Sequence, residues 1–158
     1  MLDLGPASGQ NLLVYGRFAR WIHFADLFGE PWSQRAEESA GGLHLPRLDR
    51  AYDVVFAWDT LDRLFPEARS RLVQWLINIT APTTRVHAVV RSSEDAIWRP
   101  LRFTLLDLGR IRYETASTAR LPVSKLLPAE VAKVLAPLRV ANAFTLKNGL
   151  REYVAVRP

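Results

Sequence analysis

The sequence contains no cysteine, and this absence excludes several kinds of chemistry. A chain without thiols forms no disulfide, holds no metal through thiolates and has no cysteine nucleophile. Histidine is also scarce, with three residues among 158, so we expect no metal site. The lack of cysteine also favours the cytoplasm as the compartment.

Long apolar runs are missing as well. The longest, such as residues 54–58, are far shorter than the roughly 20 residues that a membrane-spanning helix needs, and no basic segment precedes an apolar one at the N-terminus. The sequence therefore predicts neither membrane insertion nor export. Because the 158 residues suffice for one buried core and are too few for two ordinary domains, we expect a single domain over residues 1–158.

Acidic residues are outnumbered by basic ones, 16 to 21, which gives a formal charge of +5. The basic residues are spread along the chain and form no cluster. This spread favours a solvated, arginine-rich surface, with nucleic-acid binding as the alternative.

The eight glycines include two, Gly5 and Gly9, that enclose the most informative stretch of the chain. We expect a buried strand over residues 1–4, a tight turn from Gly5 to Gly9 and an amphipathic helix over residues 10–20, with Ser8 as the N-cap of the helix. Glycines let a ligand approach the turn, and the N–H groups of the first helical turn favour an anion or carboxylate. We therefore expect the turn to cradle a cofactor.

The residues of the glycine turn exclude two known nucleotide-binding motifs. A dinucleotide fingerprint starting at Gly5 would have glycines where the chain has Ala7 and Gln10. A P-loop is excluded because no Gly-Lys-Ser/Thr follows. These exclusions narrow the choice of cofactor.

A second strand is predicted at residues 21–24, and Asp26 follows its end. An acid at the carboxyl end of the second strand of a βαβ unit lies where the ribose hydroxyls of a nucleotide would reach. The alternative is that Asp26 only caps the next turn. Taken together with the glycine turn, the ligand interpretation is favoured.

Residues 52–59 form an apolar run bounded by acids, which is typical of a central parallel strand buried on both faces. Its end places Trp58 and Asp59 at the carboxyl edge of the sheet, where open α/β sheets bind ligands. A packed aromatic residue and a helix-capping acid are the alternative interpretation. We therefore treat both residues as candidates for the site.

The other expected elements follow from proline positions and apolar spacing. In the first helix, Leu12, Leu13, Tyr15, Phe18 and Ala19 are expected to face the sheet. Beyond it we expect a short strand at 43–45, a helix from Pro66 that ends before Pro82, and a strand at 86–90. A loop at 91–100 is expected to form a wall of the substrate pocket, followed by a helical segment at 102–108 and a stretch at 110–121 whose secondary structure is ambiguous. The chain then continues with a helix at 128–135 and a hairpin of strands 140–146 and 150–156 joined across Asn148-Gly149.

This order of elements resembles the class I S-adenosylmethionine-dependent methyltransferase family over nearly the whole chain. Residues 3–9, Asp-Leu-Gly-Pro-Ala-Ser-Gly, resemble the family's first motif, which implies that Asp3, Gly5, Pro6, Ala7 and Gly9 bind the cofactor. By the same resemblance, Asp26 matches the acid that binds the ribose and Leu27 the apolar residue against the adenine. Residues 53–64 are similar to the fourth motif, which implies that Trp58 and Asp59 border the methionine part and the substrate.

The resemblance implies a Rossmann-like, three-layer αβα sandwich with a mostly parallel sheet ending in an antiparallel hairpin. It also implies S-adenosylmethionine as cofactor and methyl transfer by in-line displacement. Asp59 is then the catalytic candidate near the methyl group and Trp58 part of the pocket wall. The sequence lacks the Asn/Asp-Pro-Pro-aromatic motif of amino-group acceptors on bases or glutamine, so a small-molecule acceptor is expected. A catalytically inactive scaffold or interaction subunit and an RNA-directed methyltransferase are the alternatives.

Three departures from the family pattern bear on the site. Ala7 stands at a glycine position, and no acid before Tyr52 matches the one that binds the adenine amine. The family has a helical segment ahead of its first strand, whereas this sequence begins at the strand. We therefore expect a start further upstream, an open site, or another subunit over the exposed sheet face, with a homodimer favoured.

Overall fold

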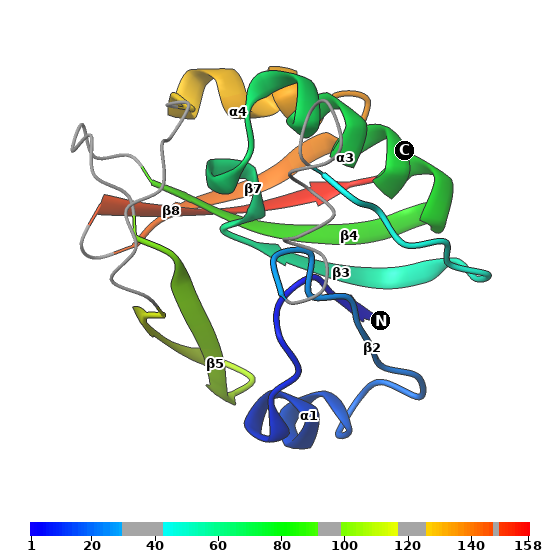
Figure 1. Cartoon of the computed structure of the whole chain (residues 1–158), viewed down its shortest axis with the longest axis vertical. Coiled ribbons are helices and arrows are strands. Elements are labelled where there is room, and N and C mark those ends of the chain that lie inside the picture. Colours follow the sequence, from blue (N-terminus) through cyan, green and yellow to red (C-terminus); the bar gives the residue numbers. More distant parts are fainter. Residues whose placement is uncertain (30–42, 92–98, 117–125, 147–148) are drawn as a thin grey trace.

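The computed structural model describes residues 1–29, 43–91, 99–116, 126–146 and 149–158. These residues form one six-stranded sheet, in the order β2-β1-β3-β4-β8-β7, and a separate pair of strands, β5 and β6 (Figure 1). The elements are β1 (Leu2–Asp3), α1 (Gly9–Tyr15), β2 (His23–Phe24), β3 (Tyr52–Trp58), η1 (Thr60–Arg63), α3 (Pro66–Ile79), β4 (Thr80–Arg91), β5 (Leu101–Asp107), β6 (Arg110–Thr115), α4 (Pro128–Leu135), β7 (Arg139–Thr145) and β8 (Leu150–Val156).

The large sheet is parallel at one side and antiparallel at the other. Strand β1 lies between β2 and β3, and both pairings are parallel, as is the pairing of β3 with β4. Strand β8 then runs antiparallel to both β4 and β7. The predicted mostly parallel sheet with a terminal antiparallel hairpin is therefore confirmed. The residues of the predicted Asn-Gly turn lie partly outside the described residues.

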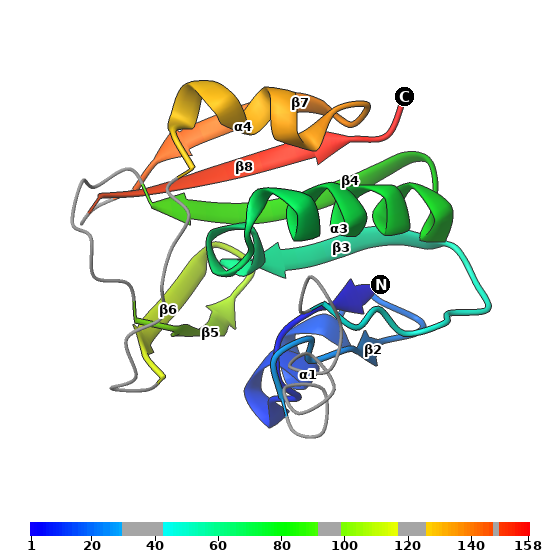
Figure 2. The ribbon, with the colours of Figure 1, turned by 45° about the horizontal axis from the view of Figure 1, so that its top comes forward.

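Two layers cover the sheet, one on each face (Figures 1 and 2). Helices α3 and α4 pack on one face, over a core that includes Leu72, Leu76 and Val131. On the other face lie α1 and the β5–β6 hairpin, over a second core that includes Tyr15, Trp58 and Phe103. The three-layer arrangement is confirmed, with the difference that a hairpin shares one outer layer with a helix.

The predicted helix over residues 102–108 is wrong, because this segment is strand β5. Leu101, Phe103 and Leu105 are buried in alternation, while Arg102 between them is exposed. An alternation of this kind is the two-residue period of a strand with one buried face. The apolar residues of β5 therefore face the sheet, and β6 pairs with β5 through an antiparallel ladder.

The short strand predicted at residues 43–45 is also wrong, because this segment has no strand pairing. Leu43 is buried, and its carbonyl accepts a hydrogen bond of 3.1 Å from Arg71 of α3. The carbonyl of Pro46 accepts one of 2.9 Å from the indole of Trp75. These two bonds hold the segment against α3, so side chains of the helix satisfy the carbonyls that a neighbouring strand would otherwise have bonded.

The first helix is shorter than predicted and buries a different face. Ser8 is its N-cap, as expected, and accepts from the N–H of Asn11. The buried residues of α1 are Asn11, Val14 and Tyr15, whereas the side chains of Leu12 and Leu13 are 49% and 71% exposed. The prediction that Leu12 and Leu13 face the sheet is wrong, because the helix is oriented by contacts of Tyr15 and Asn11 described below.

None of the helices in the described parts of the chain has the length and apolar character needed to cross a bilayer.

Candidate functional site

The glycine turn is fixed by Asp3, whose side chain is fully buried at the end of β1. One carboxylate oxygen accepts from the N–H of Gly5 at 2.8 Å and from the indole of Trp58 at 2.6 Å. The other accepts from the hydroxyl of Tyr15 at 2.6 Å. Burial raises the pKa of Asp3, and these three donors together with the side chain of Asn11 lower it in part. Asp3 therefore joins β1, the turn, α1 and the end of β3.

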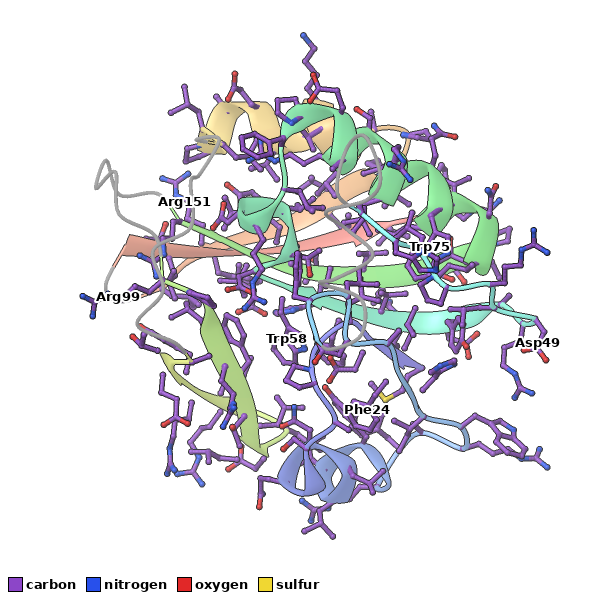
Figure 3. The ribbon with its side chains drawn as sticks, in the orientation of Figure 1. Phe24, Asp49, Trp58, Trp75, Arg99 and Arg151 are labelled. Carbon is purple, nitrogen blue, oxygen red and sulfur yellow. The ribbon has the colours of Figure 1, made fainter. Side chains whose placement is uncertain are left out.

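Trp58 lies with its side chain against the glycine turn (Figure 3). Its backbone has a left-handed φ of 47°, an uncommon conformation for a bulky residue. A Cβ atom placed on Gly5 would lie 3.1 Å from the indole Cδ1, so the absence of a side chain at Gly5 admits the indole. The ring stacks between Phe56 and Phe103, with centroid distances of 4.9 and 5.0 Å. The turn that the sequence predicts as a cofactor cradle thus holds an aromatic side chain of the protein.

Asp59 is buried and paired with Arg63 of η1, with 3.1 Å between the guanidinium Nε and one carboxylate oxygen. Its other oxygen accepts from the N–H of Leu101 at 3.1 Å. Burial raises the pKa of Asp59, whereas the charge of Arg63 lowers it. Arg63 also donates to the carbonyl of Leu101 at 3.0 Å. The pair therefore fastens the start of β5 to the end of β3.

Asp26 is half-buried after β2 and has a capping contact. One carboxylate oxygen accepts from the N–H of Phe28 at 3.2 Å. A Cβ at Gly29 would collide with the other oxygen, so the carboxylate of Asp26 would have to shift to admit a side chain there. Asp26 also lines a cavity at the carboxyl edge of the sheet. Lining the cavity and capping the turn, which the sequence presented as alternatives, are therefore compatible.

One small cavity brings five of the sequence-predicted residues together. Its volume is about 20 Å³, and it is lined by Leu4, Gly5, Pro6, Asn11, Asp26, Phe28, Trp58, Asp59, Thr60, Arg63, Leu101 and Phe103. Ala7 and Gly9 are exposed and are not among its lining residues. Leu27 and Asp3 do not line the cavity either. Leu27 is buried in the core under α3, and the carboxylate of Asp3 is hydrogen-bonded to the indole of Trp58.

The sequence does not single out Asn11 and Phe103, whose side chains also belong to this region. The amide of Asn11, 2% exposed, donates to the carbonyl of Phe103 at 3.3 Å and accepts from the N–H of Leu105 at 2.8 Å. The side chain of α1 thereby bonds β5 as a neighbouring strand would. A polar residue beside Val14 and Tyr15 on the buried helix face is the signal that points to Asn11; Phe103 lies in a segment wrongly predicted as helix.

An adenosine-sized cofactor does not fit this cavity while Trp58 and Phe103 lie as described. A volume of about 20 Å³ is of the order of a single water site, whereas small-molecule pockets have roughly 300–1,000 Å³. The residue types at this edge of the sheet suit a nucleotide, but the side chains of Trp58 and Phe103 fill the space that it would need. We call this state, with the indole of Trp58 against Gly5 and stacked on Phe103, the closed arrangement.

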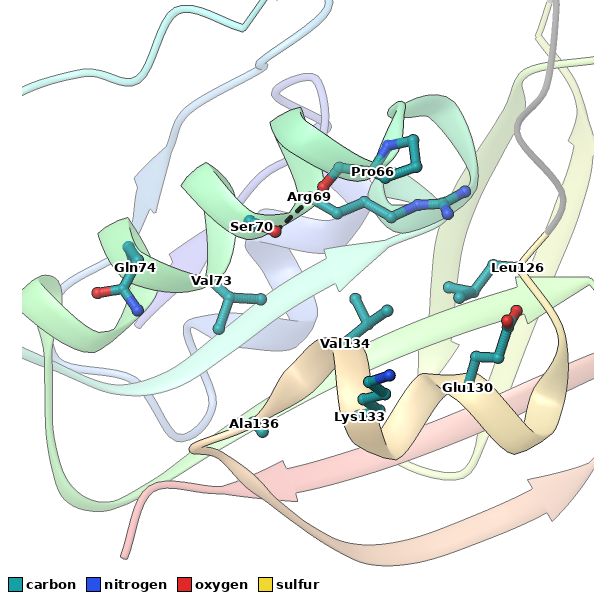
Figure 4. A pocket seen from close by; sticks show the side chains of 10 residues that line it. All are labelled: Pro66, Arg69, Ser70, Val73, Gln74, Leu126, Glu130, Lys133, Val134 and Ala136. Atoms are coloured by element: carbon teal, nitrogen blue, oxygen red, sulfur yellow. Dashed lines mark hydrogen bonds between the residues drawn. The ribbon is translucent and has the colours of Figure 1, made fainter.

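A larger cavity of about 470 Å³ lies between α3 and α4 (Figure 4). It is lined by Pro66, Arg69, Ser70, Val73, Gln74, Leu126, Glu130, Lys133, Val134 and Ala136. None of the predicted site residues is among these. Within the described ranges, no group of three or more His, Asp or Glu side chains is placed to hold a metal ion.

Comparison with known proteins places the fold. No protein-family model matches the sequence, and no curated protein matches it. Among solved structures, 1,6-didemethyltoxoflavin-N1-methyltransferase from Burkholderia thailandensis, with bound 1,6-didemethyltoxoflavin and S-adenosylhomocysteine, has a TM-score of 0.60 at 17% identity over 99% of this chain and 69% of that one. Magnesium protoporphyrin IX methyltransferase from Synechocystis PCC 6803, with bound SAM, has a TM-score of 0.55 at 16% identity over the same shares.

The glycopeptide N-methyltransferase MtfA, complexed with S-adenosylhomocysteine, has a TM-score of 0.51 at 18% identity and is matched over 72% of this chain. This chain spans 58% of the length of that structure. Likeness at such identities concerns the backbone. It shows that the chain has the Rossmann-like fold of class I methyltransferases, as the sequence resemblance predicted.

Proposed function

We propose that this chain is an S-adenosylmethionine-dependent methyltransferase that acts on a small molecule. The observation that carries the proposal is the convergence of Gly5, Asp26 and Trp58-Asp59, from the ends of β1, β2 and β3, on one cavity. Open α/β sheets bind ligands at this edge. The SAM bound in one similar structure and the S-adenosylhomocysteine and 1,6-didemethyltoxoflavin bound in another support the cofactor and the size class of the acceptor.

The proposal requires that the closed arrangement opens. In the open form, Gly5, Pro6, Ala7 and Gly9 would contact the cofactor, with Asp3 holding the turn. Asp26 would accept from its ribose, with Leu27 near the base and Asp59 near the reacting groups. When bound, the cofactor supplies the activated methyl group; the protein's own contribution is to align it with the acceptor and to exclude water.

Titration with S-adenosylmethionine tests the proposal directly. At about 100 times its dissociation constant, a ligand specific for the folded state stabilises that state by roughly 2.7 kcal/mol, measured as a shift in thermal unfolding. Asp26→Asn is expected to weaken the shift because an amide accepts fewer hydrogen bonds than a carboxylate. Asp53→Asn, which removes an exposed acid of β3, is the matched control and should keep it. No shift at millimolar ligand would contradict the proposal.

Asn11→Ala is expected to raise the affinity for S-adenosylmethionine. The change removes the two hydrogen bonds that hold β5, and with it Phe103, over the indole of Trp58. If each bond contributes about 1 kcal/mol to the closed arrangement, the apparent dissociation constant falls by roughly tenfold or more, because a larger fraction of the protein is open. Calorimetric titration measures the change. Gln10→Ala, an exposed position on the same helix, should leave the affinity unchanged.

A catalytically inactive scaffold with this fold is the second candidate. This candidate is favoured by the hydrogen bonds that Asp3 makes with Tyr15 and Trp58 and by the contacts of Asp59 with Arg63 and Leu101. These contacts hold neighbouring elements together and keep the indole of Trp58 in the space where a cofactor would bind. The two candidates differ in one result. If neither the unmodified chain nor Asn11→Ala binds S-adenosylmethionine, the scaffold interpretation holds and the enzymatic one fails.

A further inference from the structure

A third cavity, of about 230 Å³, lies between the sheet, α1 and the β5–β6 hairpin. We name it the hairpin cavity. It is lined by Val14, Phe18, Phe56, His87, Leu105, Asp107, Leu108, Gly109, Arg110, Ile111 and Glu152. Most of these residues are apolar. The space is several times the roughly 30 Å³ that a water molecule occupies in the liquid, so it is large enough for a small ring compound.

A pair of polar side chains lies on the sheet side of the hairpin cavity. Nε2 of His87, on β4, lies 2.9 Å from a carboxylate oxygen of Glu152, on the neighbouring strand β8. This bond lowers the pKa of Glu152, so the carboxylate is ionised at neutral pH. An ionised carboxylate only accepts hydrogen bonds, which assigns the shared hydrogen to Nε2 of His87. The side chain of Glu152 is 24% exposed and lends the cavity a negative charge.

The other charges around the hairpin cavity offset each other. Arg110 and Asp107, in the turn between β5 and β6, form an ion pair of 2.6 Å. Nδ1 of His87 is buried and has no hydrogen-bond partner among the described residues. A buried polar atom without a partner costs about 1–3 kcal/mol, a cost that a polar ligand group in the cavity would relieve. An apolar cavity that presents the carboxylate of Glu152 is complementary to an apolar cation.

The hairpin cavity adjoins the cavity at the glycine turn through Trp58. The indole lines the cavity at the glycine turn and contacts two residues that line the hairpin cavity, with ring centroids 4.9 Å from Phe56 and 5.4 Å from His87. Phe103 lines the small cavity and Leu105, on the same face of β5, lines the hairpin cavity. The stacked pair of Trp58 and Phe103 therefore adjoins both spaces.

We propose that the hairpin cavity binds a small apolar ring compound carrying a protonated amine, with the ring among Phe56, Leu105 and Ile111 and the amine at Glu152. The binding site stands on the geometry of the cavity alone. The site does not depend on the proposed function, because its cavity is separate from the one at the glycine turn.

Three indole compounds that differ in charge test this proposal by two-dimensional ¹H–¹⁵N NMR, without cofactor. Tryptamine carries an ammonium group, indole is neutral and indole-3-propionate is an anion. Tryptamine is expected to shift the amide signals of Phe56, Ile111 and Glu152 in a saturable way. Indole should bind more weakly, and indole-3-propionate most weakly of the three.

Glu152→Gln supplies the decisive comparison. Loss of a charge-assisted hydrogen bond, at about 1.5 kcal/mol or more, should weaken tryptamine binding by roughly tenfold, while indole binding stays unchanged and reports an intact cavity. Glu114→Gln, an exposed acid on β6, should change neither. Lack of saturable shifts with tryptamine, or equal binding of the anion, would overturn the proposal. Tryptamine binding to a chain that does not bind S-adenosylmethionine would uphold the site and refute the methyltransferase.

Discussion

Asp3→Ala is expected to destabilise the folded chain by about 3–5 kcal/mol, because it leaves several hydrogen-bond donors unpaired at about 1–3 kcal/mol each. The substitution leaves three donors without their acceptor: the buried hydroxyl of Tyr15, the buried indole N–H of Trp58 and the partly buried N–H of Gly5. Each buried polar group left unpaired costs about 1–3 kcal/mol. The free energy of unfolding, from urea denaturation followed by circular dichroism, measures the loss.

Asp3→Asn is the matched control, because it keeps the shape of the side chain. The amide oxygen still accepts from Gly5 and Trp58, and the amide nitrogen can donate to the oxygen of Tyr15. Burial already raises the pKa of Asp3, so replacing the carboxylate with a neutral group also removes a desolvation cost. We expect Asp3→Asn to lose much less stability than Asp3→Ala. Equal losses would mean that the three donors do not depend on an acceptor at this position.

Asp62→Asn is expected to stabilise the chain above neutral pH. Asp62 lies in η1, 4% exposed, and accepts from the N–H of Arg91 at the end of β4. Burial, aided by the charge of Asp59, raises the pKa of Asp62 from 3.8 to about 7, against the opposing effects of the N–H of Arg91 and of nearby arginines. The folded chain therefore holds a proton that the unfolded chain releases between these pH values.

The sign of the pH dependence follows from this difference. Below about pH 4, Asp62 is protonated in both the folded and the unfolded chain, so it does not change the free energy of unfolding. As the pH rises toward 7, the unfolded chain loses this proton while the folded chain keeps it, and the free energy of unfolding falls. Above pH 7 the full cost, on the order of 4 kcal/mol for such a shift, is present.

Urea denaturation at pH 4 and at pH 8 tests this dependence. Asp62→Asn should match the unmodified chain at pH 4 and exceed it in stability at pH 8, since its amide still accepts from Arg91. Asp107→Asn, at an exposed acid whose pKa Arg110 lowers, should show a difference of opposite sign. A stability gain of Asp62→Asn that is equal at both pH values would contradict the assigned pKa.

The elements that the sequence predicts correctly are those whose pattern is local. Pro66 and Glu67 mark the start of α3, and Pro128 and Glu130 that of α4, where Glu130 accepts from the N–H of Leu127 at 3.0 Å. The continuous apolar run of β3 needs no partner to be recognised, because burial on both faces leaves no alternation. The fold class was therefore predictable from a few short stretches.

Strand β5 was not predictable in the same way. Leu105 and Leu106 are adjacent, so the alternation of Leu101, Phe103 and Leu105 is interrupted and a helical spacing fits equally well. What decides for a strand is the ladder to β6 and the bonding of Asn11, which lies 92 and 94 residues from its two partners. Contacts at such separations leave no trace in local spacing.

The candidate site shows the same limit at the level of single side chains. The sequence places Gly5, Asp26 and Trp58 at one edge, and they line one cavity. It does not reveal that the indole of Trp58 turns toward Asp3, because this orientation depends on a left-handed backbone at Trp58 and on the ring of Phe103 across the chain. The sequence thus predicts which residues lie at the ends of the strands. It does not predict the side-chain conformation of Trp58 that fills the site.

The position of β4 in the sheet has a consequence for synthesis of the chain. Its parallel neighbour β3 precedes it, but its other neighbour, β8, is translated long after it. While the chain emerges from the ribosome, one edge of β4 exposes unpaired N–H and C=O groups beside apolar residues such as Val86 and Val90. A nascent chain arrested before β8 is thus exposed to association with other chains, and release of the C-terminal hairpin ends that interval.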